Sequence, residues 1–154
     1  MAADCLICKK HSGLIQTLEG SVIYEDEHVY VGHLGARSGE QLAYLGYVMV
    51  ELKRHAPGFG DLTAEEAAAV GIAANEVSRA LKEALHAEHV YAFVQGDGVP
   101  HFHMHLIPRY PGTPTAYWNP MKLADWPDAP RGGEVDVLEV CSRLLESLRL
   151  RREA

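Results

Sequence analysis

The amino-acid sequence predicts an α+β fold, in which an antiparallel sheet of about five strands carries one long helix and a C-terminal helix. Short apolar or alternating segments, typical of strands, recur between residues 21 and 107. Helical periodicity separates them at 63–87 and returns at 135–152. Short polar or glycine-containing turns join neighbouring strand segments, which favours antiparallel hairpins.

The length and composition indicate one globular domain spanning 1–154. The chain has 154 residues, of which 47% are hydrophobic and 23% charged, so it can bury a sizeable core. Within it we expect a core over 1–110, a loop rich in proline and tryptophan over 111–133, and the C-terminal helix over 135–152.

The charge and the lack of long apolar runs restrict the partners. A net charge of −7 does not suit a nucleic-acid backbone or an anionic membrane, whereas a nucleotide needs only a local cluster of donors. No apolar run reaches the ~18 residues of a membrane span, and the N-terminus lacks the apolar region of a signal peptide. The few cysteines suit a reducing compartment, so we expect a cytoplasmic protein.

The first motif is Cys5-x-x-Cys8, which has three interpretations: half of a zinc site, a redox pair or two buried thiols. A redox pair normally starts a helix that follows a strand, and no strand is predicted before Cys5. A zinc site needs two more ligands, so two histidines remote in sequence would have to supply them.

The next segments predict strands. Residues 21–24 and 28–31 suggest a hairpin around the acidic turn 25–27. The mostly apolar run 43–52 predicts one further strand, followed by two basic residues and His55. On its own, a histidine at a strand end is most often simply exposed.

Residues 63–87 predict the long helix. Thr63 can cap its start, and Glu66, three residues later, completes a capping box. Apolar residues recur at spacings of three and four from Val70 to Leu85. They give the helix one apolar face, which we expect to cover the sheet.

A second hairpin is predicted from the strand 89–95, the tight turn 96–98 and the strand 100–107. Three histidines alternate with three apolar residues in its second strand: His101, His103 and His105 with Phe102, Met104 and Leu106. Alternation places the histidines on one face and the apolar residues on the core face. Same-face neighbours lie roughly 6.5–7 Å apart, so one phosphate or one metal ion can touch two imidazoles. A solvated surface cluster, a metal site and a catalytic site are the possible interpretations.

The segment 110–133 is long for a loop, and long loops in compact domains are often functional. Tyr117 and Trp118 either stack on a base or close over the site; the alternative is that both tryptophans, Trp118 and Trp126, simply pack the loop against the body. In the C-terminal helix, Cys141 lies on the apolar stripe, so we interpret it as a core residue rather than a reactive thiol.

The histidine-rich strand resembles the signature of a known family. Its pattern is His-φ-His-φ-His-φ-φ, with φ apolar, and it continues into Pro108-Arg109. This is similar to the histidine triad (HIT) family of nucleotide hydrolases and transferases, and the resemblance covers residues 1–110. It implies a homodimeric enzyme that acts at a nucleoside α-phosphate, for example of dinucleoside polyphosphates or adenosine phosphoramidates.

The resemblance also implies roles for individual residues. His103, the middle histidine, would be the nucleophile that forms a covalent nucleotidyl-histidine. His105 would be catalytic and bind the substrate, donating to an oxygen on which charge develops. Gln95 stands where relatives have an Asn or Gln at the end of the preceding strand, and it would contact phosphate.

Family members with the cysteine pair complete a zinc site with a histidine that follows Lys-Arg. Carried over by position, the zinc ligands are Cys5, Cys8, His55 and His101. Such a zinc would be structural, because four protein ligands leave no open position.

The chain departs from the family pattern at two places. The loop after Gln95 is short, and Asp97 or Gly98 stands where relatives carry a Gln that contacts phosphate. His33 lies near the place where relatives often hold the ribose hydroxyls with Asp or Asn.

Imidazole suits nucleophilic attack on phosphorus near neutral pH, provided that an acceptor such as a backbone carbonyl holds its other N–H. Two rival functions remain at this point. One is a metal-dependent hydrolase in which His101, His103 and His105 form an open catalytic metal site. The other is a nucleotide or zinc binder that keeps the fold without turnover.

Overall fold

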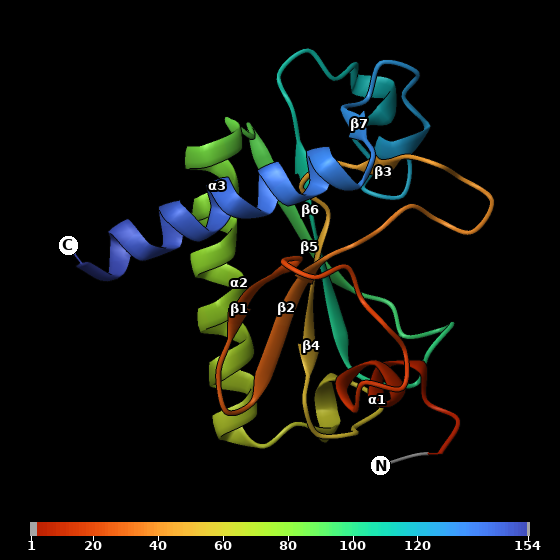
Figure 1. The fold of residues 1–154 in the computed structure, drawn as a ribbon, viewed down its shortest axis with the longest axis vertical. Coiled ribbons are helices and arrows are strands. Elements are labelled where there is room, and N and C mark those ends of the chain that lie inside the picture. Colours follow the sequence, from red (N-terminus) through yellow and green to blue (C-terminus); the bar gives the residue numbers. More distant parts are fainter. Residues whose placement is uncertain (1–2, 154) are drawn as a thin grey trace.

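A computed structural model describes residues 3–153, and its centre is a five-stranded antiparallel sheet in the order β1-β2-β4-β6-β5 (Figure 1). The strands are β1 (Val22–Glu25), β2 (Val29–His33), β4 (Val48–Leu52), β6 (His103–Arg109) and β5 (His89–Val94). Together with the helices, this sheet confirms the predicted α+β fold. Both expected hairpins are present, since β1 pairs with β2 and β5 pairs with β6.

The prediction of one strand over 43–52 is wrong. The run is divided into β3 (Ala43–Tyr44) and β4 by a turn at Gly46, whose φ is 87°. A Cβ at Gly46 would lie 2.8 Å from the Tyr110 hydroxyl and 2.9 Å from Pro108 Cγ, so only glycine fits this turn.

The segment after β6 has local structure. It contains two short 3₁₀ helices, Thr115–Tyr117 and Leu123–Asp125, and the strand β7 (Arg131–Gly132). β7 pairs with β3 in a small second sheet. This unit lies at one end of the main sheet, and the helix α1 (Leu6–His11), which the sequence did not predict, lies toward the other end (Figure 1).

The two long helices lie where the periodicity predicts them. In α2 (Ala64–Leu85), the Thr63 hydroxyl accepts from Glu66 N at 3.2 Å and Glu66 Oε2 accepts from Thr63 N at 2.8 Å, which is the expected capping box. α3 (Glu134–Glu153) packs against α2 and β1. Cys141 on α3 is fully buried in the core, and burial raises the pKa of its thiol to about 11.

The core lies between α2 and one face of the main sheet. Its fully buried sheet residues are Val29, Val31, Val48, Val50, Leu52 and Leu106. Because strand side chains alternate, Tyr30, Met49, Glu51, His103 and His105 belong to the opposite face. We call this the open face. Among residues 3–153, no helix is long and apolar enough to cross a membrane.

Candidate active site and metal cluster

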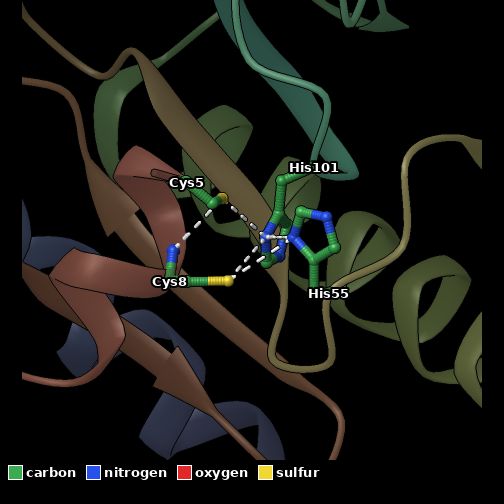
Figure 2. A group of neighbouring side chains, drawn as sticks. All are labelled: Cys5, Cys8, His55 and His101. Carbon is green, nitrogen blue, oxygen red and sulfur yellow. Dashed lines mark hydrogen bonds between the residues drawn. The ribbon is translucent and has the colours of Figure 1, made fainter. Parts of the chain in front are cut away.

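Four side chains from three parts of the chain converge at one end of the sheet (Figure 2). Cys5 caps the N-terminus of α1 and Cys8 lies in its first turn, while His55 follows β4 and His101 precedes β6. β4 ends where the antiparallel β6 begins, which brings the two histidines together. The four ligand atoms all lie within 4.8 Å of one another. We call these residues the metal cluster.

The spacing of the metal cluster fits a zinc ion. His101 Nδ1 lies 3.3 Å from Cys5 Sγ and 3.5 Å from Cys8 Sγ, and the two histidine Nδ1 atoms lie 3.2 Å apart. A zinc tetrahedron with ordinary bond lengths has S···N edges of about 3.6 Å and N···N edges of about 3.3 Å. The donor set and the distances therefore agree with a closed four-coordinate site.

The second ring nitrogen of His101 supports the same interpretation. His101 Nε2 donates to the Leu52 carbonyl at 2.6 Å, which leaves Nδ1 without a proton and free to bind a metal. The ring is fully buried, and both cysteines are more than nine-tenths buried. The predicted start of the strand at residue 100 is wrong: β6 begins at His103, and His101 lies in the preceding segment, directed at the cysteines.

His103 is the first residue of β6, and its ring nitrogens have different surroundings. Nδ1 donates to the His101 carbonyl at 2.6 Å. A carbonyl can only accept, so the proton of the neutral ring is on Nδ1 and Nε2 carries a lone pair. The ring is mostly buried and lies on the open face, so Nε2 is the nitrogen available for chemistry.

His105, two residues along, is held by two aromatic side chains. Its ring centroid lies 5.2 Å from that of His103. Nδ1 lies 2.7 Å from the Tyr47 hydroxyl, and the Phe93 ring stacks on the imidazole at 4.6 Å with an interplanar angle of 2°. Burial, and secondarily the charge of His103, lowers the pKa of His105 to about 4, so the ring is neutral at pH 7.

A cavity of about 590 Å³ lies on the open face over β2 and β4, and neither His103 nor His105 is among the residues that line it. Its lining includes Met49 and Glu51, which are the β4 partners of His105 and His103 in the sheet. The remaining walls come from α1, from the loop before β1, from β2 and the chain that follows it, and from the end of β7 and the start of α3. Ligand sites for small molecules typically have volumes of about 300–1,000 Å³, so the cavity can accept a nucleoside.

Glu51 is a buried carboxylate that the sequence did not single out. Its Oε2 accepts from His11 Nε2 at 2.8 Å, and Lys10 forms an ion pair with Oε1. Burial alone would raise the pKa of Glu51, but His11 and Lys10 together hold it below its usual value. Glu51 thereby joins α1, and with it the cysteine pair, to the open face.

His33, where the chain departs from the family pattern, and Gln95, which precedes the short loop, both lie away from the rings of His103 and His105 in their hydrogen bonding. Both ring nitrogens of His33 bind backbone, since Nδ1 donates to Leu34 O at 2.6 Å and Nε2 accepts from Gly46 N at 2.8 Å. His33 therefore supports the turn before β4. Gln95 is exposed directly after β5, and within residues 3–153 no hydrogen bond connects it with His103 or His105.

The two tryptophans of the 110–133 segment have different surroundings, since Trp118 is 41% exposed whereas Trp126 packs against a buried cluster. The guanidinium of Arg109 lies 3.8 Å from the centre of the Trp118 ring, and Trp118 Nε1 donates to Thr113 O at 2.9 Å. Trp126 packs against the cluster of Tyr44, Tyr47, Ile107, Leu123 and Ala129. The contacts of Trp126 favour the packing interpretation for this residue.

Comparisons with known proteins agree with this architecture. A family model described as the HIT domain matches residues 16–112. A histidine triad nucleotide-binding protein from Sulfolobus tokodaii aligns with a TM-score of 0.73 and 18% identity over 96% of this chain and 94% of its own. A zinc-bound histidine triad protein from Mycobacterium smegmatis gives a TM-score of 0.69 and 21% identity over 97% and 96%. A HIT family protein from Bacillus anthracis is 30% identical over 71% of this chain and 76% of its own, with a TM-score of 0.60. The comparison with curated proteins gives no match.

Proposed function

This chain belongs to the HIT domain family, whose members are in general nucleotide hydrolases or transferases, and we propose that it cleaves a bond at a nucleoside α-phosphate through a covalent nucleotidyl-His103. One observation carries the proposal. The His101 carbonyl holds the proton of His103 on Nδ1, so Nε2 presents its lone pair on the open face, where a cavity of nucleoside size lies over the neighbouring strand β4.

The reaction has two steps. In the first, His103 Nε2 attacks the α-phosphorus, a P–N bond forms, and the bond to the leaving group breaks with its electron pair departing on that group. In the second, water or another acceptor attacks phosphorus and the P–N electron pair returns to Nε2. The attack by water deposits one proton, which solvent or the site accepts.

His105 would act on the charge that develops in both steps. Its ring lies beside that of His103 on the open face, and a donor there can bind a non-bridging phosphate oxygen. Removing one such donor typically costs about 10²–10³ in rate. Gln95, exposed at the end of β5, would add a phosphate contact once a substrate is bound.

The metal cluster would have a structural role and would not take part in the reaction. We propose that Cys5, Cys8, His55 and His101 bind a structural zinc ion, as their geometry allows and as the zinc-bound relative from M. smegmatis suggests. When bound, zinc would join α1, the end of β4 and the segment before β6. The carbonyl that holds His103 belongs to the ligand His101, so the cluster also supports the orientation of the nucleophile.

The rival metal-dependent hydrolase is not favoured by the arrangement of the three histidines. His101 has its Nδ1 in the metal cluster, whereas His103 and His105 hold their Nδ1 atoms against a carbonyl and a hydroxyl. In the described part of the chain, residues 3–153, the group of side chains that could hold a metal contains His101 but neither His103 nor His105.

Intact-protein mass spectrometry tests the proposal. The protein is mixed briefly with diadenosine tetraphosphate or an adenosine phosphoramidate, and we expect a transient mass increase of one nucleoside monophosphate. The adduct should be absent in His103→Ala and present in His89→Ala, which removes an exposed histidine of β5. Product formation without an adduct, lost on chelation, would support the metal hydrolase, and neither adduct nor product would support a binding protein.

A further inference from the structure

His105 differs from His103 in the group that faces its Nδ1. For His103 this group is a carbonyl, which only accepts, whereas for His105 it is the hydroxyl of Tyr47, which can donate or accept. The direction of the hydrogen bond between Tyr47 and His105 therefore determines where the His105 proton lies.

The surroundings of Tyr47 fix that direction. Tyr47 is more than nine-tenths buried, and burial raises the pKa of its hydroxyl, so the hydroxyl keeps its proton. Within residues 3–153, the acceptor that its side chain meets is His105 Nδ1, at 2.7 Å. A buried hydroxyl without an acceptor is unfavourable, so the O–H donates to Nδ1. Nδ1 then carries a lone pair, and the single proton of the neutral His105 ring is on Nε2.

The backbone and a second aromatic ring hold this pair in place. The Tyr47 carbonyl accepts from Leu34 N at 2.7 Å, which fixes the chain just before β4. On the other side, Phe93 is the β5 partner of His105 in the sheet, and its ring lies parallel to the imidazole. Stacking against Phe93 therefore fixes the plane of the imidazole ring, and the hydrogen bond with Tyr47 fixes the rotation of the ring within that plane.

We propose that Tyr47 is a positioning residue that holds His105 as its Nε2–H tautomer, opposite to the Nδ1–H tautomer of His103. The pair then presents one lone pair and one N–H donor to the same phosphate group. The tautomer assignment stands on the free protein alone, whereas its effect on turnover rests on the proposed function.

The proposal has a kinetic consequence. Without the hydroxyl, His105 is free to adopt the other tautomer, in which Nε2 presents a lone pair to an anionic phosphate. For part of the time, His105 would then offer no Nε2–H donor in the step in which negative charge develops on a phosphate oxygen. We therefore expect Tyr47→Phe to lower kcat about 10–100-fold with little change in KM.

Nitrogen-15 NMR of the imidazole rings in the zinc-loaded protein tests the assignment without any substrate. In the wild type, we expect His105 to show a protonated Nε2 and an unprotonated Nδ1, and His103 to show the reverse. In Tyr47→Phe, the two His105 nitrogens should move toward averaged shifts, while those of His103 stay unchanged. A wild-type His105 with its proton on Nδ1, or a His105 spectrum unaffected by Tyr47→Phe, would overturn the proposal.

Tyr44→Phe is the matched control. Tyr44 is also buried, packs in the same cluster as Tyr47, and donates its hydroxyl to Pro108 O of the same strand β6 at 2.6 Å. It removes a comparable hydrogen bond without touching His105, so the His105 shifts and kcat should stay near wild type. Altered tautomers in Tyr47→Phe with unchanged kcat would retain the Tyr47 assignment and remove His105 from the proposed mechanism. If the wild type turns over no nucleotide, the proposed function fails, and the NMR result still decides the role of Tyr47.

Discussion

His101 and His103 are two residues apart in one alternating stretch, and the structure gives them opposite chemical situations. In His101 both ring nitrogens have protein partners, one in the metal cluster and one on the Leu52 carbonyl. In His103 a single nitrogen is held, and the other faces the open side of the sheet. The partner of the second ring nitrogen, rather than the residue type, therefore decides whether each of these histidines has a structural or a chemical role.

The two regions are nevertheless joined by one hydrogen bond. The carbonyl of His101 holds Nδ1 of His103, so the backbone of a metal-cluster residue orients the proposed nucleophile. The orientation of His103 should therefore depend on the metal cluster, whereas the metal cluster should not depend on His103. Changing His103 should leave the metal cluster intact, whereas disturbing the cluster should affect both stability and the site.

The largest expected effect comes from His103→Ala. Removing the nucleophile should lower turnover by about 10⁴-fold or more, because no other side chain at this position can form the phosphorus–nitrogen bond. Zinc content and thermal stability should stay close to wild type. Steady-state kinetics, metal analysis and thermal unfolding on the same sample check this, and a loss of zinc together with activity would contradict the separate roles of His101 and His103.

Loss of the metal cluster is expected to have the next largest effect. Cys8→Ser should reduce the zinc content from about one ion per chain to almost none and lower the free energy of unfolding by about 3 kcal/mol or more. Chelation of the wild type should destabilise it similarly. Cys141→Ser is the control for removing a buried thiol, since Cys141 lies in the core on α3, and its zinc content should stay near one per chain. Full zinc content in Cys8→Ser would contradict the ligand assignment.

His105, the third histidine of the stretch, should make the stability of the protein depend on pH. Burial lowers its pKa to about 4, with a contribution from His103, while Tyr47 and Phe93 are uncharged neighbours. In the unfolded chain a histidine titrates near 6.5, so between about pH 6.5 and 4 the unfolded state binds more protons than the folded state. The contribution of His105 to stability is therefore complete above about pH 6.5 and is lost as the pH falls toward 4. NMR titration of the His105 ring should show its midpoint near pH 4. Stability measured with denaturant at pH 7 and 5 should fall less in His105→Asn than in wild type, and an equal fall would refute the burial argument.

Much of this architecture could be predicted because it depends on local patterns. The helix α2 follows from apolar spacing and a capping box between Thr63 and Glu66, which are determined within a few residues. The convergence of the four cluster residues, implied by the family resemblance, also appears in the structure. Their spacing in sequence fits a recurrent motif, so no detailed knowledge of packing was needed.

The surroundings of His105 could not be predicted, because they depend on how distant segments meet. Tyr47 lies directly after the turn at Gly46, which the continuous apolar character of the run 43–52 hides, and it contacts His105 of the neighbouring strand β6. Phe93 lies over His105 because of the register between β5 and β6. The glycine inside an otherwise strand-like run was the one local signal that could have indicated the turn.

The smallest expected effect tests whether stability and chemistry are independent. Thr63→Ala removes the cap of α2, which lies on the covered side of the sheet, and should cost about 1 kcal/mol of unfolding free energy. The open face is unaffected, so kcat and KM should match wild type at temperatures well below unfolding. Thermal unfolding and steady-state kinetics check both statements. If Thr63→Ala also lowered kcat severalfold, turnover would follow global stability, and the losses expected in the metal-cluster variants could no longer be assigned to the link between His101 and His103.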